Sequence, residues 1–138
     1  MENLQIAAAQ ISASSQFDGN HLPSHGRLHF KGGHGAWAAG ASDPNQWFQI
    51  DLRVEANVTF VATQGRYGSS GQRVTQYKLQ YSKDGLSFQV YKQNGENSDK
   101  VRRIVTKQIK KKRTTTKNKL KKIQTGNQGT SAGPRVGV

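Results

Sequence analysis

Residues 46–52, Gln-Trp-Phe-Gln-Ile-Asp-Leu, constrain the fold of this chain more than any other stretch. Phe48, Ile50 and Leu52 alternate with polar Gln49 and Asp51, which is the period-two pattern of a strand with one buried face. The sequence Ser-Asp-Pro-Asn comes directly before it and favours a turn, so the strand has a defined start. We therefore expect this strand to lie inside a sheet, with its apolar face turned to the core.

Other strands are expected on both sides of this one, at residues 4–14, 58–64, 77–81 and 88–92. Residues 53–56 are interpreted as a connection, and Gly, Asn and Asp turns separate the other strands. No stretch before residue 100 has convincing helical periodicity, so the pattern predicts an all-β sandwich or barrel. The loops at residues 16–35 and 65–73 are longer than a connection needs, and long loops on a rigid sheet often carry binding sites.

Charge divides the chain near residue 100. The first 100 residues hold 9 Lys or Arg and all 8 acids, whereas residues 101–138 hold 12 basic residues, no acid and no aromatic residue. The net charge of +13 therefore belongs to the C-terminal part. We predict a domain at residues 1–100 and a basic, low-complexity tail at residues 101–138 that is partly helical or disordered. There is no cysteine, no apolar run long enough to span a bilayer and no recognisable signal peptide.

Five segments of the first part carry a resemblance to a known family. They are Ile-Ser-Ala-Ser-Ser at 11–15, Gly-Ala-Trp at 35–37, Asn-Gln-Trp-Phe-Gln-Ile-Asp-Leu at 45–52, Thr-Gln-Gly-Arg at 63–66 and Val-Thr-Gln-Tyr-Lys-Leu-Gln-Tyr-Ser-Lys-Asp-Gly at 74–85. In this order and at this spacing they resemble a discoidin domain, the coagulation factor V/VIII C-type module, over about residues 4–100. The family's later Gly-Asn-x-Asp, Pro-x-x-Ala-Arg and Leu-Arg-x-Glu segments are absent, so the resemblance is to a domain that is incomplete at its C-terminal end.

The resemblance implies a jelly-roll β-sandwich of the galactose-binding-like kind that is extracellular or at the cell surface and non-catalytic. It also implies binding of a glycan, an extracellular protein or an anionic phospholipid through loops called spikes, here residues 17–25, 30–34 and 67–72. The candidate ligand-binding residues are His21, Leu22, Pro23, Lys31, His34, Arg66 and Tyr67.

Two of these candidates have a specific chemistry. Arg66 could grip a carboxylate or sugar hydroxyls, and Tyr67 could stack on a sugar, although ties from Arg66 to loop carbonyls are an equally good interpretation. Leu22 is the one apolar residue at the first spike tip. Burying one Leu side chain contributes about 1.5–3 kcal/mol, too little for stable membrane docking alone. We therefore rank glycan or protein binding above phospholipid binding.

Metal binding and catalysis are not expected. All four histidines, at positions 21, 25, 29 and 34, lie in one loop region whose Gly and Pro content argues against a helix, so we interpret them as solvated. Calcium, held by oxygens of Asp18, Asn20 and Asp43, is the one cofactor left open. No Gly-x-Ser-x-Gly motif or suitable carboxylate pair points to an enzyme.

Trp37 and Trp47 are expected in the core.

The basic tail supplies the alternative function. A chain of positive charge binds nucleic acid or another polyanion largely without sequence specificity. The candidate residues for this function are Lys110, Lys111, Lys112, Arg113, Lys121 and Lys122.

Overall fold

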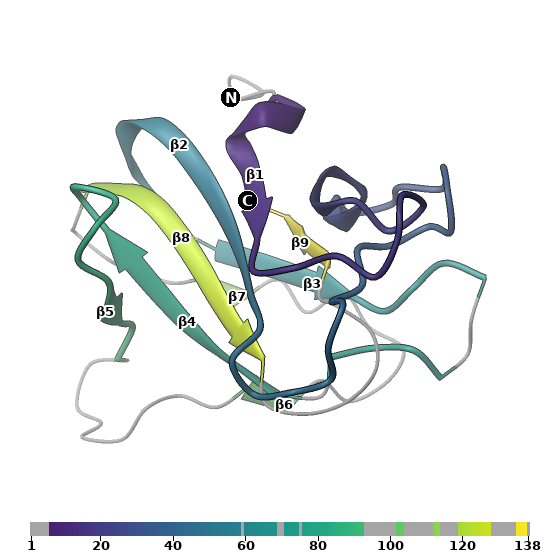
Figure 1. Ribbon diagram of the computed structural model, residues 1–138. Coiled ribbons are helices and arrows are strands. Elements are labelled where there is room, and N and C mark those ends of the chain that lie inside the picture. Colours follow the sequence, from purple (N-terminus) through teal and green to yellow (C-terminus); the bar gives the residue numbers. More distant parts are fainter. Residues whose placement is uncertain are drawn as a thin grey trace.

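The computed structural model describes residues 6–58, 60–68, 71–74, 76–92, 102–103, 112–113, 119–127 and 135–137. Within these ranges the chain is built from strands and two short 3₁₀ turns, with no α-helix (Figure 1). In chain order the elements are η1 (Ala8–Gln10), β1 (Ile11–Ala13), η2 (Pro23–Gly26), β2 (Trp47–Asn57), β3 (Phe60–Gln64), β4 (Gln76–Ser82), β5 (Gln89–Val90), β6 (Arg102–Arg103), β7 (Lys112–Arg113), β8 (Lys119–Asn127) and β9 (Arg135–Gly137).

The strands form two sheets. One has the order β1-β2-β8-β4-β5, with β6 paired to β4, and the other has the order β7-β3-β9. All pairs are antiparallel. The long loop between β1 and β2 and the loop between β3 and β4 lie on the same side of the molecule, away from β5 (Figure 1).

The apolar face of β2 lies in the core, as its alternation predicts. Phe48, Ile50 and Leu52 are all buried and form one cluster with Ile11, Trp37 and Val58. Partly buried residues of β3 and β4 pack against this cluster, so both sheets contribute to it. The expectation for Trp37 is confirmed, whereas Trp47 is only half-buried at the start of β2.

Residues 53–56, interpreted from the sequence as a connection, belong instead to β2. The pairing with β8 shifts register between Asp51 and Ala56, which marks an irregularity rather than the end of the strand. Arg53 has a φ of 60°, and its backbone N–H donates to Asp51 Oδ1 at 2.8 Å. The Asp51 side chain thus accepts the hydrogen bond of the Arg53 N–H at the point where the β2–β8 pairing is interrupted.

The structure also differs from the predicted tail. β8 (Lys119–Asn127) lies between β2 and β4, where a helical or disordered segment was expected. An extended chain at this position pairs the backbone groups of both neighbours, which would otherwise form sheet edges. Charge content hid this strand, because its lysines interrupt any alternation of apolar residues. The predicted division at residue 100 itself stays a prediction.

The hairpin expected at residues 83–85 is present between β4 and β5. Asp84 accepts hydrogen bonds from the backbone N–H groups of Leu86 and Ser87 and from the Ser82 hydroxyl. These bonds hold the pKa of Asp84 well below its usual range, the Ser87 amide having the largest effect. The Asn94-Gly95 segment lies outside the described residues.

The contact between η2 and β2 makes the core sensitive to one glycine. A Cβ at Gly26 would lie 2.4 Å from Cε2 of the Phe48 ring, which is too close for any relaxed packing. We expect Gly26→Ala to lower the free energy of unfolding by about 1–3 kcal/mol, the usual cost of overpacking. Thermal or urea unfolding measures this change. Gly19→Ala is the matched control, since its Cβ would meet nothing within 4 Å. Equal effects of the two substitutions would contradict this packing.

Candidate functional site

The loop that leaves β1 is fixed to the core by Trp37. The indole Nε1–H donates to the Ser15 carbonyl at 2.8 Å, and the ring packs against Phe48 with centroids 5.3 Å apart. Phe17 N–H then donates to the Ala38 carbonyl at 2.9 Å. The first spike therefore starts from a position that the core determines.

Asp18 organises the turn that follows. Its Oδ1 accepts a hydrogen bond from the Asn20 backbone N–H at 2.8 Å and lies 2.7 Å from His21 Nδ1. The His21 hydrogen bond lowers the pKa of Asp18 below its ordinary 3.8, and the Asn20 amide adds to this, while partial burial opposes it. An ionised carboxylate therefore faces the His21 imidazole.

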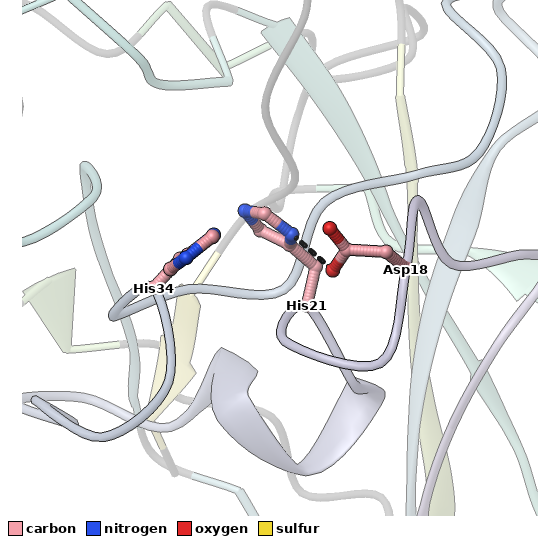
Figure 2. Close-up of side chains that lie close together, drawn as sticks. All are labelled: Asp18, His21 and His34. Atoms are coloured by element: carbon pink, nitrogen blue, oxygen red, sulfur yellow. Dashed lines mark hydrogen bonds and ion pairs between the residues drawn. The ribbon is translucent and has the colours of Figure 1, made fainter.

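His21 is buried, with 6% of its surface exposed, which corrects the interpretation of all four histidines as solvated. Its imidazole lies between the Asp18 carboxylate and the His34 ring (Figure 2). The two imidazoles meet edge to face, with centroids 4.9 Å apart. Asp18, His21 and His34 thus form one cluster, in which each offers a ligand atom within 4.8 Å of the others. We refer to these three residues as the Asp-His-His cluster.

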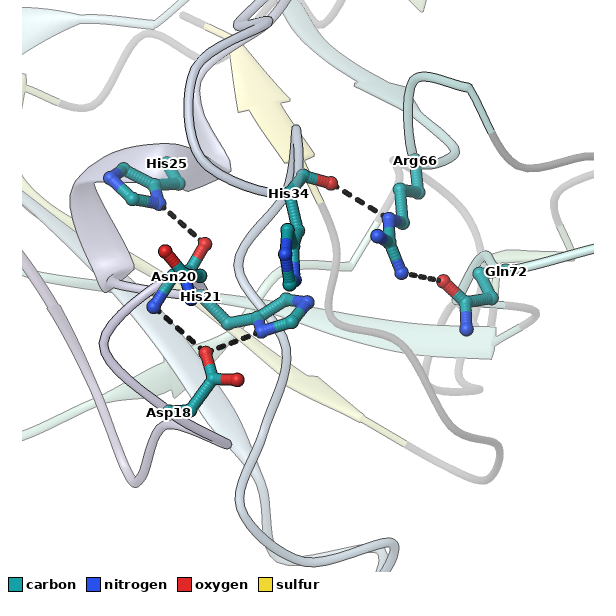
Figure 3. Close-up of polar contacts among 7 residues, drawn as sticks. All are labelled: Asp18, Asn20, His21, His25, His34, Arg66 and Gln72. Carbon is teal, nitrogen blue, oxygen red and sulfur yellow. Dashed lines mark hydrogen bonds and ion pairs between the residues drawn. The ribbon is translucent and has the colours of Figure 1, made fainter.

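The backbone of His34 is held from two sides, while its side chain is exposed. Its N–H donates to the Asn20 carbonyl at 3.3 Å, and its carbonyl accepts from Arg66 Nε at 2.7 Å (Figure 3). Gly33, directly before it, has a φ of 55°, a conformation that favours glycine. These contacts bring the second spike against the first.

Arg66 joins the third spike to the other two. Besides its bond to the His34 carbonyl, the guanidinium donates from Nη1 to Gln72 Oε1 (Figure 3). A guanidinium has five N–H donors. With these two bonds to described residues made, Arg66 still has donors that a ligand could use. Arg66 thus donates to a loop carbonyl, as one interpretation predicted, and this bond does not occupy all of its N–H donors.

Phe17 adds an aromatic surface to the cluster. Its side chain is among the most exposed large apolar ones described, at 67%, and it meets His21 edge to face with centroids 5.6 Å apart. An exposed ring beside an ionised carboxylate and two imidazoles combines an apolar face with directional polar groups.

The other predicted residues lie around this group. Lys31 Nζ lies 5.3 Å from the centre of the exposed Tyr67 ring, so these two residues pair with each other. Leu22 is half-buried, and Pro23 begins η2. His25, which was not a candidate, stacks on Phe30 and bonds through Nδ1 to the Asn20 carbonyl.

Sequence reasoning named His21, His34 and Arg66 but assigned no ligand-binding role to Phe17 or Gln72. Asp18 was considered only as a calcium ligand. One signal for Phe17 was available, because it lies directly before Asp-Gly-Asn, a sequence that favours a turn, and turns usually run over the surface.

One calcium candidate, Asp43, has partners of its own. Asp43 accepts from the Asn45 backbone N–H at 2.7 Å and from Gln46 Nε2 at 2.9 Å, so its carboxylate serves the turn before β2. Asp43 is not among the residues of the Asp-His-His cluster. Of the polyanion candidates, Lys112 and Arg113 form β7 and Lys121 and Lys122 lie in β8, while Lys110 and Lys111 lie outside the described residues.

Comparison with known proteins identifies the family. The F5/8 type C domain model matches residues 10–131, and the chain belongs to this family, whose domain is a non-catalytic binding module. This match confirms the resemblance to the discoidin domain and extends it beyond residue 100.

Solved structures share the jelly-roll fold. Discoidin II of Dictyostelium discoideum matches with a TM-score of 0.73 and 21% identity over 91% of this chain and 52% of its own. The chain therefore spans about half the length of discoidin II. The family 32 carbohydrate-binding module of Clostridium perfringens NanJ, in complex with galactose, matches at 0.61 with 16% identity, covering 95% and 91% of the two chains. CpGH89CBM32-5 of the same organism, in complex with GalNAc-β-1,3-galactose, matches at 0.57 with 15% identity, covering 96% and 99%.

The Asp18 carboxylate should stabilise the turn in a pH-dependent way. Because its pKa is lowered in the folded state, its contribution is present above the ordinary value of 3.8 and is lost as the pH falls through the folded pKa. We expect wild type to exceed Asp18→Ala in the free energy of unfolding at about pH 5. The difference should shrink below pH 3.8. Urea unfolding across this range measures it, and a difference that is unchanged at pH 2.5 would contradict the assignment.

Proposed function

We propose that this chain is an extracellular, non-catalytic lectin-like module that binds galactose-type glycans through Phe17, Asp18, His21, His34 and Arg66. The observation that carries the proposal is the exposed Phe17 ring beside the buried His21 imidazole and the ionised Asp18 carboxylate.

A pyranose has two kinds of surface that such a site can recognise. Galactose presents a patch of C–H groups on one face, because its axial 4-hydroxyl leaves the carbons on the opposite side free. An exposed aromatic ring covers such a patch and removes apolar area from water. Phe17, which is 67% exposed and anchored through its backbone to Ala38, provides a ring at a fixed position.

The hydroxyl groups of the sugar need partners of both kinds. The Asp18 carboxylate accepts, the guanidinium of Arg66 donates in a planar fork, and an imidazole does either according to its tautomer. A few well-placed polar groups around an apolar surface are typical of small-ligand sites. Because Asp18 is tied to Asn20 and Arg66 to His34, little side-chain freedom is lost on binding.

The comparisons support the sugar class. The chain belongs to the F5/8 type C family, and two solved structures with its fold are complexes with galactose or GalNAc-β-1,3-galactose. The partner we propose is a cell-surface or extracellular glycan. Phospholipid ranks lower, since Leu22 is half-buried. Among the described residues, no helix combines the length and apolarity that crossing a bilayer requires.

Retention on immobilised galactose tests the proposal. We expect wild type to bind and to be eluted by free galactose but not by the same concentration of glucose. Phe17→Ala should lose about tenfold or more in affinity, since one aromatic contact contributes on the order of 1.4 kcal/mol. Leu86→Ala is the matched control, because Leu86 is equally a large exposed side chain but belongs to the β4–β5 turn, far from the spikes (Figure 1).

Two results would contradict the proposal. One is no retention of the folded wild type on galactose or on any glycan of an array. The other is an equal loss from Phe17→Ala and Leu86→Ala. Binding of the full chain to a polyanion such as heparin, lost on raising the salt and on replacing Lys110 and Lys111 by glutamine, would favour the alternative function of the basic tail. That alternative stays a prediction from charge alone.

A further inference from the structure

The geometry points to a zinc site in the Asp-His-His cluster, with one oxygen of Asp18 and one ring nitrogen each of His21 and His34 as ligands. This site goes beyond the proposed sugar binding and would exist without any sugar. The ligand atoms of the three side chains already lie within 4.8 Å of one another.

The residue types select a borderline divalent ion. Two imidazoles and one carboxylate are a ligand set that zinc accepts, and an open fourth position is then filled by water. Calcium and magnesium prefer oxygen ligands throughout, so they do not suit a set in which two of three ligands are nitrogen.

The distances require two small adjustments. Zn–N and Zn–O bonds of about 2.0–2.2 Å place tetrahedral ligand atoms roughly 3.3 Å apart. Asp18 Oδ1 and His21 Nδ1 are 2.7 Å apart and must separate slightly, whereas the ligand atoms of all three residues lie within 4.8 Å of one another, so His34 must move by at most roughly 1.5 Å. Its side chain is exposed and rotates about its own bonds, while its backbone stays held by Asn20 and Arg66.

The proposed site would have one buried ligand and one ligand that solvent reaches. The side chain of His21 is 7% exposed and that of Asp18 is 39% exposed, so one ligand is fixed while another borders on solvent (Figure 2). One positive charge beside the site is Arg66, whose Nε and Nη1 point to the His34 carbonyl and to Gln72. The guanidinium thus weakens the attraction for a cation without occupying the ligand positions (Figure 3).

Calorimetric titration of the EDTA-treated full chain with zinc chloride, in the absence of sugar, tests the site. We expect one zinc ion per chain. His34→Ala and Asp18→Asn should each weaken binding by about tenfold or more, the usual effect of losing one ligand or its support. Cobalt(II) should give visible absorption bands of a low-coordinate ion, and these bands should disappear in His34→Ala. Calcium chloride should give no comparable heat.

His29→Asn is the matched control. It removes one imidazole from the same loop region but outside the cluster, and asparagine tolerates the positive φ of 59° at this position. We expect it to bind zinc like wild type. The inference is overturned if wild type binds no zinc, if His34→Ala binds as tightly as wild type, or if His29→Asn weakens binding as much as His34→Ala.

The failure of this inference is separable from that of the proposed function. Galactose retention is measured in EDTA and zinc titration without sugar, so each experiment has its own readout. Zinc binding without galactose retention would support the metal site and contradict the proposed function. Galactose retention without zinc binding would contradict the metal site and leave the proposed function standing.

Discussion

The rest of the structure depends on the contacts of the Trp37 indole. It packs against Phe48 of β2 on one side and donates a hydrogen bond to the Ser15 carbonyl on the other. The apolar face of β2 thereby determines where the chain leaves the sheet toward Phe17 and Asp18. Burying a large ring beside β2 stabilises the core, and satisfying its N–H avoids the cost of an unpaired donor. A single side chain thus links the stability of the fold to the position of the candidate site.

Loops outside the core are held together by a chain of polar contacts rather than by apolar area. Asp18 bonds to the turn and to His21, the Asn20 carbonyl accepts from His34, and the His34 carbonyl accepts from Arg66. Each of these bonds contributes modestly to stability, since a net hydrogen bond is worth about 0.5–1.5 kcal/mol. Together they bring three spikes into one surface and leave the Phe17 ring exposed.

The fold was largely predictable because a period-two pattern reports burial directly. Phe48, Ile50 and Leu52 predicted the buried face of β2, and the motif order predicted the family. β8 was missed because its place between β2 and β4 depends on pairing with distant strands, which no local pattern encodes. The site was predictable in part. His21, His34 and Arg66 could be named by type, but their meeting point depends on backbone turns at Asp18 and Gly33 that only the folded chain defines.

We propose that the core positions one ligand-binding surface built from three loops. A galactose titration followed by ¹H–¹⁵N correlation spectra tests this most directly, because every amide reports its own surroundings. We expect shifts at the amides of Phe17, Asp18, His21, His34 and Arg66, and at the indole N–H of Trp37. The amides of the β4–β5 turn should not move. Shifts centred on that turn, or an unchanged spectrum at saturating galactose, would contradict the account.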